Sequence, residues 1–338
     1  MSFVIMVVYM ILYGAQSALG GGGILIGLNL SAQGTIWNLP NYIGEIFTAS
    51  ALKTPVLAMV GGINGVKETT NFQFAIDQTY AHPAAAQPAI TETASLTAPT
   101  AIGYVRSQDV NVAQIFHESV LISYVKMSNQ GRLSGIATSG QIENPPSEKD
   151  WQILKTLEKI SRDVEYTFVQ GTYNLATTAG TYNNTRGLNA AATTTIAAGS
   201  VQLSKSLIDQ LLRTMFANGA WFTKPVFIVN AFQKQMLSRI YGSQPTSINI
   251  GGLNITSVET DFGVIGITLD AFQSTSVLLV ADMAYVSAVS QPVPTKGHMF
   301  YEELSKSGAN ENGQIFGQLG LDHGPGFMHG TITGLTTS

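Results

Sequence analysis

Histidines are the first residues in this sequence that could do chemistry, as metal ligands or as proton carriers. His298, His323 and His329 could form a metal triad, but the segment that joins them is rich in glycine and irregular, so capped or solvated histidines are the better interpretation. His117-Glu118 has no second histidine four residues later, which excludes a zincin-type helix. The histidines therefore predict no metal site.

The carboxylates predict no catalytic pair either. Asp261, Asp270 and Asp282 stand at the ends of apolar runs, where turns favour aspartate. The sequence contains neither a nucleophile elbow nor a phosphate-binding loop. It also contains no cysteine, which excludes disulfides, thiol nucleophiles and thiolate metal sites. We therefore predict a protein that is not an enzyme and that uses no cofactor or metal.

The surface is predicted to be unusually neutral. Only 11% of the 338 residues are charged, against about 25% in typical soluble proteins. Such a surface is tolerated when other subunits cover it, although a secreted or surface-exposed protein rich in Thr and Asn fits the composition equally well. The net charge is −4 and no block of Lys or Arg is present, so the sequence does not support binding of nucleic acid through counterion release.

The longest predicted element is a helix over residues 148–173. Pro145 and Pro146 cannot continue a helix backwards, Ser147 can cap its first N–H groups, and Gly171 supplies a stop signal. Apolar residues recur at helical spacing on one face, which we predict to be its core face. They are Trp151, Leu154, Leu157, Ile160, Val164 and Phe168, with Ile153 beside them.

A hairpin arm is predicted upstream of this helix. Alternating apolar residues indicate two strands, the first around residues 71–76 and the second from Ile102 to Gln114. The segment between them, Tyr80–Ala101, has almost no apolar bulk, so it either reaches onto another molecule or is a plain flexible loop. The predicted contact residues are Phe72, Phe74, Ile76, Tyr80, Pro83, Pro88, Ile90, Leu96 and Tyr104.

The N-terminal stretch opens with an uncharged apolar run, Met1–Tyr13. A signal peptide normally begins with basic residues, which this run lacks. A membrane span needs about 20 apolar residues, and this run is shorter. We favour a third interpretation, in which translation begins later at Met6 or Met10. Four glycines at 20–23 form a predicted hinge, and an extended arm fits the residues that follow.

The second half of the chain predicts a compact α/β unit. Residues 183–198 are predicted to be a polar linker. Ser204 or Ser206 then caps a helix that ends at Gly219, and further along INIGGLNI reads as a hairpin. The other predicted elements are a strand at 225–229, a helix at 232–241, a strand at 277–281 and two or three strands after Phe300 that return beside the long helix. The inward residues of the capped helix are predicted to be Leu207, Ile208, Leu211, Leu212, Met215 and Phe216.

Four stretches of the last 80 or so residues carry a family resemblance. They are SVETDFGVIGITLDAF at 257–272, VLLVADMAYVSAV at 277–289, FYEELSKSGANENGQIFGQLGL at 300–321 and HGTITGL at 329–335. In this order, after an arm, a hairpin and a long helix, they resemble the major capsid protein of tailed bacteriophages, the Hong Kong 97 fold. Gln318 departs from the acidic residue expected there, and the apolar start has no counterpart in the pattern.

The resemblance implies an α+β fold in five parts. They are an N-terminal arm at 1–65, an extended loop at 66–125, a peripheral domain at 126–200 with a spine helix at 148–173, an axial domain at 201–290 and a return to the peripheral domain at 291–338. It implies a structural protein that assembles with itself into hexamers and pentamers of an icosahedral shell. Other implied partners are scaffold, portal and decoration proteins and enclosed double-stranded DNA, bound without sequence specificity and without a membrane. The expected location is the virion, after assembly in the cytoplasm of a host bacterium.

Two rival functions stay open from sequence alone. An exported, adhesin-like surface protein would fit the apolar start and the neutral composition. A cellular nanocompartment shell would share the fold and would hold enzyme cargo in place of a genome. No particular Lys and Asn are marked as partners, so we also predict that the subunits are not covalently cross-linked.

Overall fold

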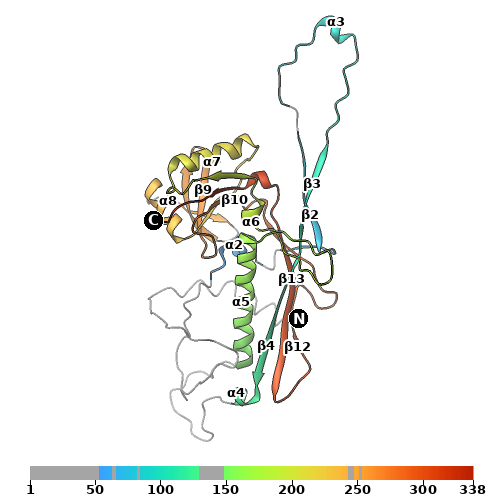
Figure 1. The fold of residues 1–338 in the computed structure, drawn as a ribbon, viewed down its shortest axis with the longest axis vertical. Coiled ribbons are helices and arrows are strands. Elements are labelled where there is room, and N and C mark those ends of the chain that lie inside the picture. Colours follow the sequence, from blue (N-terminus) through green and yellow to red (C-terminus); the bar gives the residue numbers. More distant parts are fainter. Residues whose placement is uncertain are drawn as a thin grey trace.

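The computed structural model describes residues 53–62, 66–81, 84–128, 148–242, 247–250 and 253–337. They form a body of two sheets and a long helix, from which a hairpin arm projects at one end (Figure 1). The predicted apolar start, the glycine hinge, Pro83 and the Ser147 cap lie outside the described residues. Within the described ranges, no helix is both long and apolar enough to cross a membrane.

The long helix α5 (Glu148–Gln170) ends at Gln170 and does not continue to Tyr173 as predicted. It ends there because another segment crosses at Gly171. The Gly187 amide donates to the carbonyl oxygen of Gly171 at 2.9 Å, and a Cβ on Gly171 would lie 2.6 Å from the carbonyl oxygen of Thr185. Only glycine allows so close an approach of two backbones.

The core face of α5 is fully buried only near its C-terminus. That half meets α2 (Pro55–Met59) and both sheets, whereas the other half lies beside one sheet only (Figure 1). The predicted face accordingly divides into Ile160, Val164 and Phe168, at most 1% exposed, and Trp151, Leu154 and Leu157, which are half-buried.

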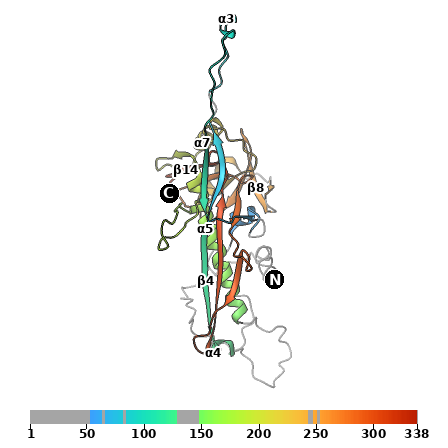
Figure 2. The same cartoon turned by 90° about the vertical axis from the view of Figure 1, so that its right-hand side faces the viewer.

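A five-stranded sheet lies along one side of α5 (Figure 2). Its centre is β13, which pairs antiparallel with β4 on one edge and with β12 and β11 on the other. Residues 115–127, for which the sequence allowed a helix or a strand, contain most of β4 and then the short helix α4 (Tyr124–Ser128). The strands are β1 (Lys67–Glu68), β4 (Gln114–Ser123), β11 (Ser287–Ser290), β12 (Met299–Glu303) and β13 (Asn310–Asp322).

A seven-stranded sheet with helices forms the second layer, in the order β5-β14-β10-β6-β9-β8-β7. Its central strands β6 and β10 are apolar apart from Asp282 at the end of β10, and every residue in them is buried, as expected for strands covered on both faces. The predicted hairpin is confirmed as β7 and β8. The elements are β5 (Thr194–Ala197), β6 (Pro225–Val229), β7 (Ser247–Ile250), β8 (Leu253–Thr260), β9 (Gly263–Leu269), β10 (Leu278–Asp282), β14 (Gly330–Thr333), α7 (Lys205–Ala217) and α8 (Ala231–Tyr241).

Two predictions about the chain path are corrected. The polar linker predicted at 183–198 holds α6 (Leu188–Ala191) and β5, and Leu188 is fully buried. The C-terminal segment returns beside α5 only as far as β13. After the 3₁₀ turn η1 (Gly326–Met328) it crosses over, and β14 pairs with β10 and β5 in the seven-stranded sheet. Short runs of Thr, Ala and Gly carry too little apolar pattern to reveal such edge strands.

The helix α7 begins as predicted, because the Ser204 hydroxyl accepts a hydrogen bond from the Leu207 amide. Its buried stripe is Ile208, Leu211, Leu212 and Met215. Phe216 was predicted to point inward, which is wrong: it is 62% exposed and its ring lies beside that of Phe262, at 6.0 Å between centroids. Successive side chains of a helix differ in direction by about 100°, so Phe216, which follows Met215, points away from the buried stripe.

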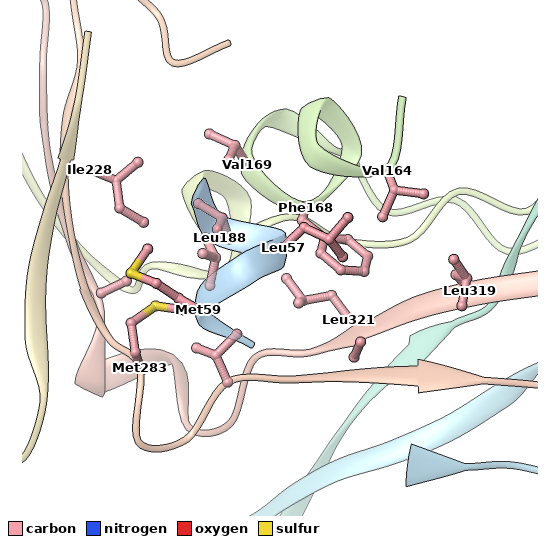
Figure 3. Packing of buried hydrophobic residues seen from close by; sticks show 14 of the residues in the cluster. Leu57, Met59, Val164, Phe168, Val169, Leu188, Ile228, Met283, Leu319 and Leu321 are labelled. Carbon is pink, nitrogen blue, oxygen red and sulfur yellow. The ribbon is translucent and has the colours of Figure 1, made fainter. Parts of the chain in front are cut away.

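The hydrophobic core joins the two layers at α2. Val56, Leu57 and Met59 are at most 5% exposed and pack among α5, β13 and the inner strands of the seven-stranded sheet (Figure 3). Beneath α2, the carboxylate of the fully buried Glu165 accepts the amides of Val56 and Leu57, both at 2.7 Å. This carboxylate therefore ties α2 to α5.

Candidate assembly surfaces

The hairpin arm is the most exposed part of the described chain. Its strands β2 (Gln73–Tyr80) and β3 (Arg106–Val112) pair antiparallel, and the tip between them holds the short helix α3 (Glu92–Ser95) (Figure 1). Every residue from 84 to 108 is exposed. A two-stranded hairpin is marginally stable in water on its own, so this arm needs a partner surface to be fixed along its length.

The root of the arm, in contrast, is tied firmly to the body. The buried Asn111 side chain donates to the carbonyl oxygens of Leu321, at 2.7 Å, and Arg186, at 3.1 Å, and accepts from the Arg186 amide at 2.7 Å. The Phe74 ring lies close to Gly320, where a Cβ would come within 2.8 Å of it. These contacts set the direction in which the arm leaves the body.

The predicted contact residues are mostly on the arm's exposed part. Phe74 and Ile76 in β2 are half-buried, whereas the other described members of this set are exposed. The exposed ones are Phe72 (51%), Tyr80 (55%), Pro88, Ile90 (70%), Leu96 (84%) and Tyr104 (55%), and Pro83 lies outside the described residues. Exposed apolar side chains along a thin arm fit contact with another molecule.

A second candidate surface is the outer edge of β4. The amide of Ala113 donates to Phe72 on the side away from β13, and amides alternate between edges along an antiparallel strand. The amides and carbonyls of Ile115, His117, Ser119 and Leu121 therefore point outward, and among the described residues they have no backbone partner. Figure 2 shows β4 at this edge of the sheet. The edge carries no Lys or Pro, the usual protection against strand pairing.

The exposed aromatic end of the seven-stranded sheet is a third surface. The rings of Phe216 and Phe222 both lie beside Phe262, at 6.0 and 5.9 Å between centroids. Trp221, 74% exposed, precedes Phe222, and Val264, 47% exposed, lies at the start of β9 just after Phe262. A monomer gains nothing from exposing such side chains together, so this end also fits a subunit contact.

The buried ionisable residues form no reactive site. The His329 ring donates from Nε2 to the carbonyl oxygen of His323 at 2.5 Å and accepts from the Asp282 amide at 3.3 Å, and complete burial lowers its pKa to about 4. The neutral His329 ring therefore joins the end of β10, at Asp282, to the segment that follows β13, at His323. Within the described residues, no cluster of His, Asp or Glu could hold a metal ion.

Comparison with known proteins identifies the family. The family model of the SU10 major capsid protein matches residues 29–336, which is most of the chain. The chain belongs to this family. It is therefore a structural capsid protein of phage virions and not an enzyme, and this decides against the exported surface protein. No curated protein matches the sequence.

Solved structures show the same fold. The cyanophage A-1(L) capsid asymmetric unit matches with a TM-score of 0.62 at 13% identity, over 88% of this chain and 97% of that chain. The capsid of the native GTA particle matches with 0.57 at 9% identity, over 92% and 100%. The capsid of Myoviridae phage XM1 matches with 0.54 at 14% identity, over 93% and 100%. The fold of this major capsid protein is thus the Hong Kong 97 fold.

Sequence reasoning missed two features of this capsid protein. Glu165 reads as a polar residue on the flank of an amphipathic helix, and its partner Leu57 lies 108 residues away. The free edge of β4 is equally hidden, because strand order is set by pairings such as β4 with β13, nearly 200 residues apart. The absence of Lys and Pro in residues 114–123 is the one signal that could have pointed to this edge.

Proposed function

We propose that this capsid protein closes into an icosahedral shell of hexamers and pentamers, in which the arm of each subunit, within residues 66–125, lies over a neighbour. The shell encloses double-stranded phage DNA without reading its sequence, in keeping with a net charge of −4. The arm and the edge of β4 supply contacts that repeat around each ring. Because a subunit must lose several contacts at once to leave, each contact can be weak.

The observation that carries this proposal is the arm itself. It projects away from the body, all of residues 84–108 are exposed, and among the described residues its two strands β2 and β3 form a sheet of their own (Figure 1). An isolated molecule obtains no stability from such an element, since ordering each residue costs about 1–2 kcal/mol of backbone entropy. A neighbouring subunit that covers the arm offsets that cost.

Deleting the tip, residues 84–98, tests this role. The expected result is a chain that keeps the unfolding midpoint and, apart from α3, the helical content of the wild type, since no buried residue is lost, but that fails to form closed shells. Circular dichroism measures the first and negative-stain microscopy the second. A matched control is Thr93→Ser in the same tip, which should assemble normally. Normal shells from the deletion variant would show that the tip is dispensable.

Scaffold, portal and decoration proteins are further partners that we propose for this shell, with assembly in the cytoplasm of the host bacterium. A nanocompartment shell is the second candidate function, because an encapsulin of Synechococcus elongatus shares the fold, with a TM-score of 0.55 at 9% identity over 88% of this chain and 93% of that chain. The contents of native particles separate the two. Nuclease-resistant DNA in the particles supports the phage capsid, and a protein cargo without DNA supports the nanocompartment.

A further inference from the structure

The ladder of the arm is interrupted once, close to the body. Ala75 pairs with Val110 and Asp77 pairs with Asp109, so Ile76 is an extra residue without a partner on β3. Such a bulge bends a strand and weakens the ladder locally. Ile76 and Asp77 are both half-buried, which shows that the alternation of faces shifts at this point.

The bulge separates a part of the arm that is fixed on the body from a more exposed outer part. On the body side, Phe74 packs on Gly320, and the Asn111 side chain bonds two backbone segments. On the outer side, every residue from 84 to 108 is exposed, and the hydroxyls of Thr79 and Ser107, 2.9 Å apart, join the two strands to each other. A bending force on the arm therefore acts at the bulge.

Two like charges face each other at this same point. Asp77 and Asp109 are directly opposite, an arrangement that destabilises a strand pair when both are ionised. Arg186 neutralises only one of them, with Nη1 at 2.7 Å from Oδ2 of Asp109.

A buried histidine lies beside this pair. His323 donates from Nδ1 to the carbonyl oxygen of Gly324, and its Nε2 lies 3.9 Å from Oδ2 of Asp109 without a hydrogen-bond partner. The other charged groups around the bulge are Asp322 and Lys67, which are paired with each other at 2.5 Å.

We propose that the arm bends at Ile76 and that the facing carboxylates of Asp77 and Asp109 set how freely it bends. When both carboxylates are charged, their repulsion loosens the ladder on the outer side of the bulge. In acid, Asp77 takes up a proton and the repulsion ends. A neighbour that brings a cation to Asp77 has the same effect, so the arm stiffens as it docks.

The direction of the pH effect follows from the ionisation of each group. Burial and the nearby Asp109 raise the pKa of Asp77, so the repulsion is absent at low pH and appears as the pH rises through that pKa. Burial lowers the pKa of His323, which is therefore neutral at neutral pH and gains a charge facing Asp109 only in acid. Both changes stiffen the arm in acid.

Distance measurements between spin labels test this proposal on the unassembled full-length chain, so the result does not depend on whether shells form. The chain has no cysteine, so two cysteines can be placed without interference. One label goes on α5 by Tyr166→Cys, which is 55% exposed, and the other goes above the bulge by Gln78→Cys or below it by Gln73→Cys, both exposed. The width of the distance distribution is measured at about pH 7 and about pH 4.

The expected widths differ on the two sides of the bulge. The distribution of distances between labels at positions 166 and 78 should be broad at about pH 7 and narrow at about pH 4. The distribution between positions 166 and 73 should be narrow at both values. Asp77→Asn, and separately deletion of Ile76, should make the distribution between positions 166 and 78 narrow at both values, whereas the exposed control Asp261→Asn should behave as wild type. Equal widths above and below the bulge, or a width that neither variant changes, would overturn the proposal.

Discussion

At the scale of single residues, two buried carboxylates stand out at the junction of α2, α5 and the seven-stranded sheet. Burial, with the nearby charge of Asp270, raises the pKa of Glu165 to about 8, and burial raises that of Asp270 to about 6. Asp270 accepts the Phe272 amide through Oδ1, while its buried Oδ2 has no partner within the described residues. Both carboxylates accept backbone amides at this junction, so we assign them a structural role there.

These carboxylates make the stability of the subunit pH-dependent. A carboxyl group whose pKa is higher in the folded chain than in the unfolded chain stabilises the fold at low pH. This contribution to the free energy of unfolding is complete below the unfolded pKa and is lost as the pH rises to the folded pKa. For Glu165 the loss runs from about 4.5 to about 8. Asp270→Asn should therefore raise the free energy of unfolding by about 1–3 kcal/mol at about pH 8 and leave it unchanged at about pH 4. Urea titrations of the unassembled chain measure both values.

The exposed Asp261 provides the matched comparison for this residue-scale prediction. Asp261→Asn should not change the free energy of unfolding at either pH. If Asp270→Asn instead destabilised the chain equally at both values, the repulsion between Asp270 and Glu165 would be negligible.

At the scale of elements, periodicity predicted the fold where apolar residues are large and regular. This holds for α5, α7, β6 and β10, whose buried stripes or runs can be read directly from the sequence. It fails for β5 and α6, because Thr and Ala give no clear period. It also fails for the crossing of β14, since the partner of a strand is set by contacts between distant residues.

The free edge of β4 gives a prediction at the same scale. The Ser119 amide points outward, so Ser119→Pro removes an outward donor and leaves the ladder with β13 intact. We expect this variant to fold as a subunit but to assemble less completely than Ser119→Ala, which removes the hydroxyl alone. Sedimentation velocity measures the assembled fraction. Equal assembly of the two variants would mean that no strand of another subunit adds to this edge.

At the scale of the whole molecule, we expect copies of the same chain to cover the exposed parts of the subunit. The exposed arm, the open edge of β4 and the aromatic end around Phe262 lie on separate elements, as contacts to several neighbours require. The resemblance in the last 80 or so residues was enough to predict the fold class, which is confirmed. The assignment of particular residues to particular contacts stays a prediction, because a single subunit contains one side of each interface.

The strength of the shell is predicted to come from non-covalent contacts alone. The chain has no cysteine, and its described Lys side chains mostly pair with carboxylates of the same subunit, as Lys149 does with Glu303 and Glu311. Particles boiled in detergent should therefore give one band at 36.0 kDa on a denaturing gel. A ladder of bands at multiples of this mass would reveal covalent cross-links between subunits.

Negative-stain microscopy of the purified full-length chain at high concentration tests the central claim most directly. The account predicts closed shells of uniform size, built from rings of this one chain. Single particles that stay monomeric at every concentration, with the arm folded back on its own body, would contradict it.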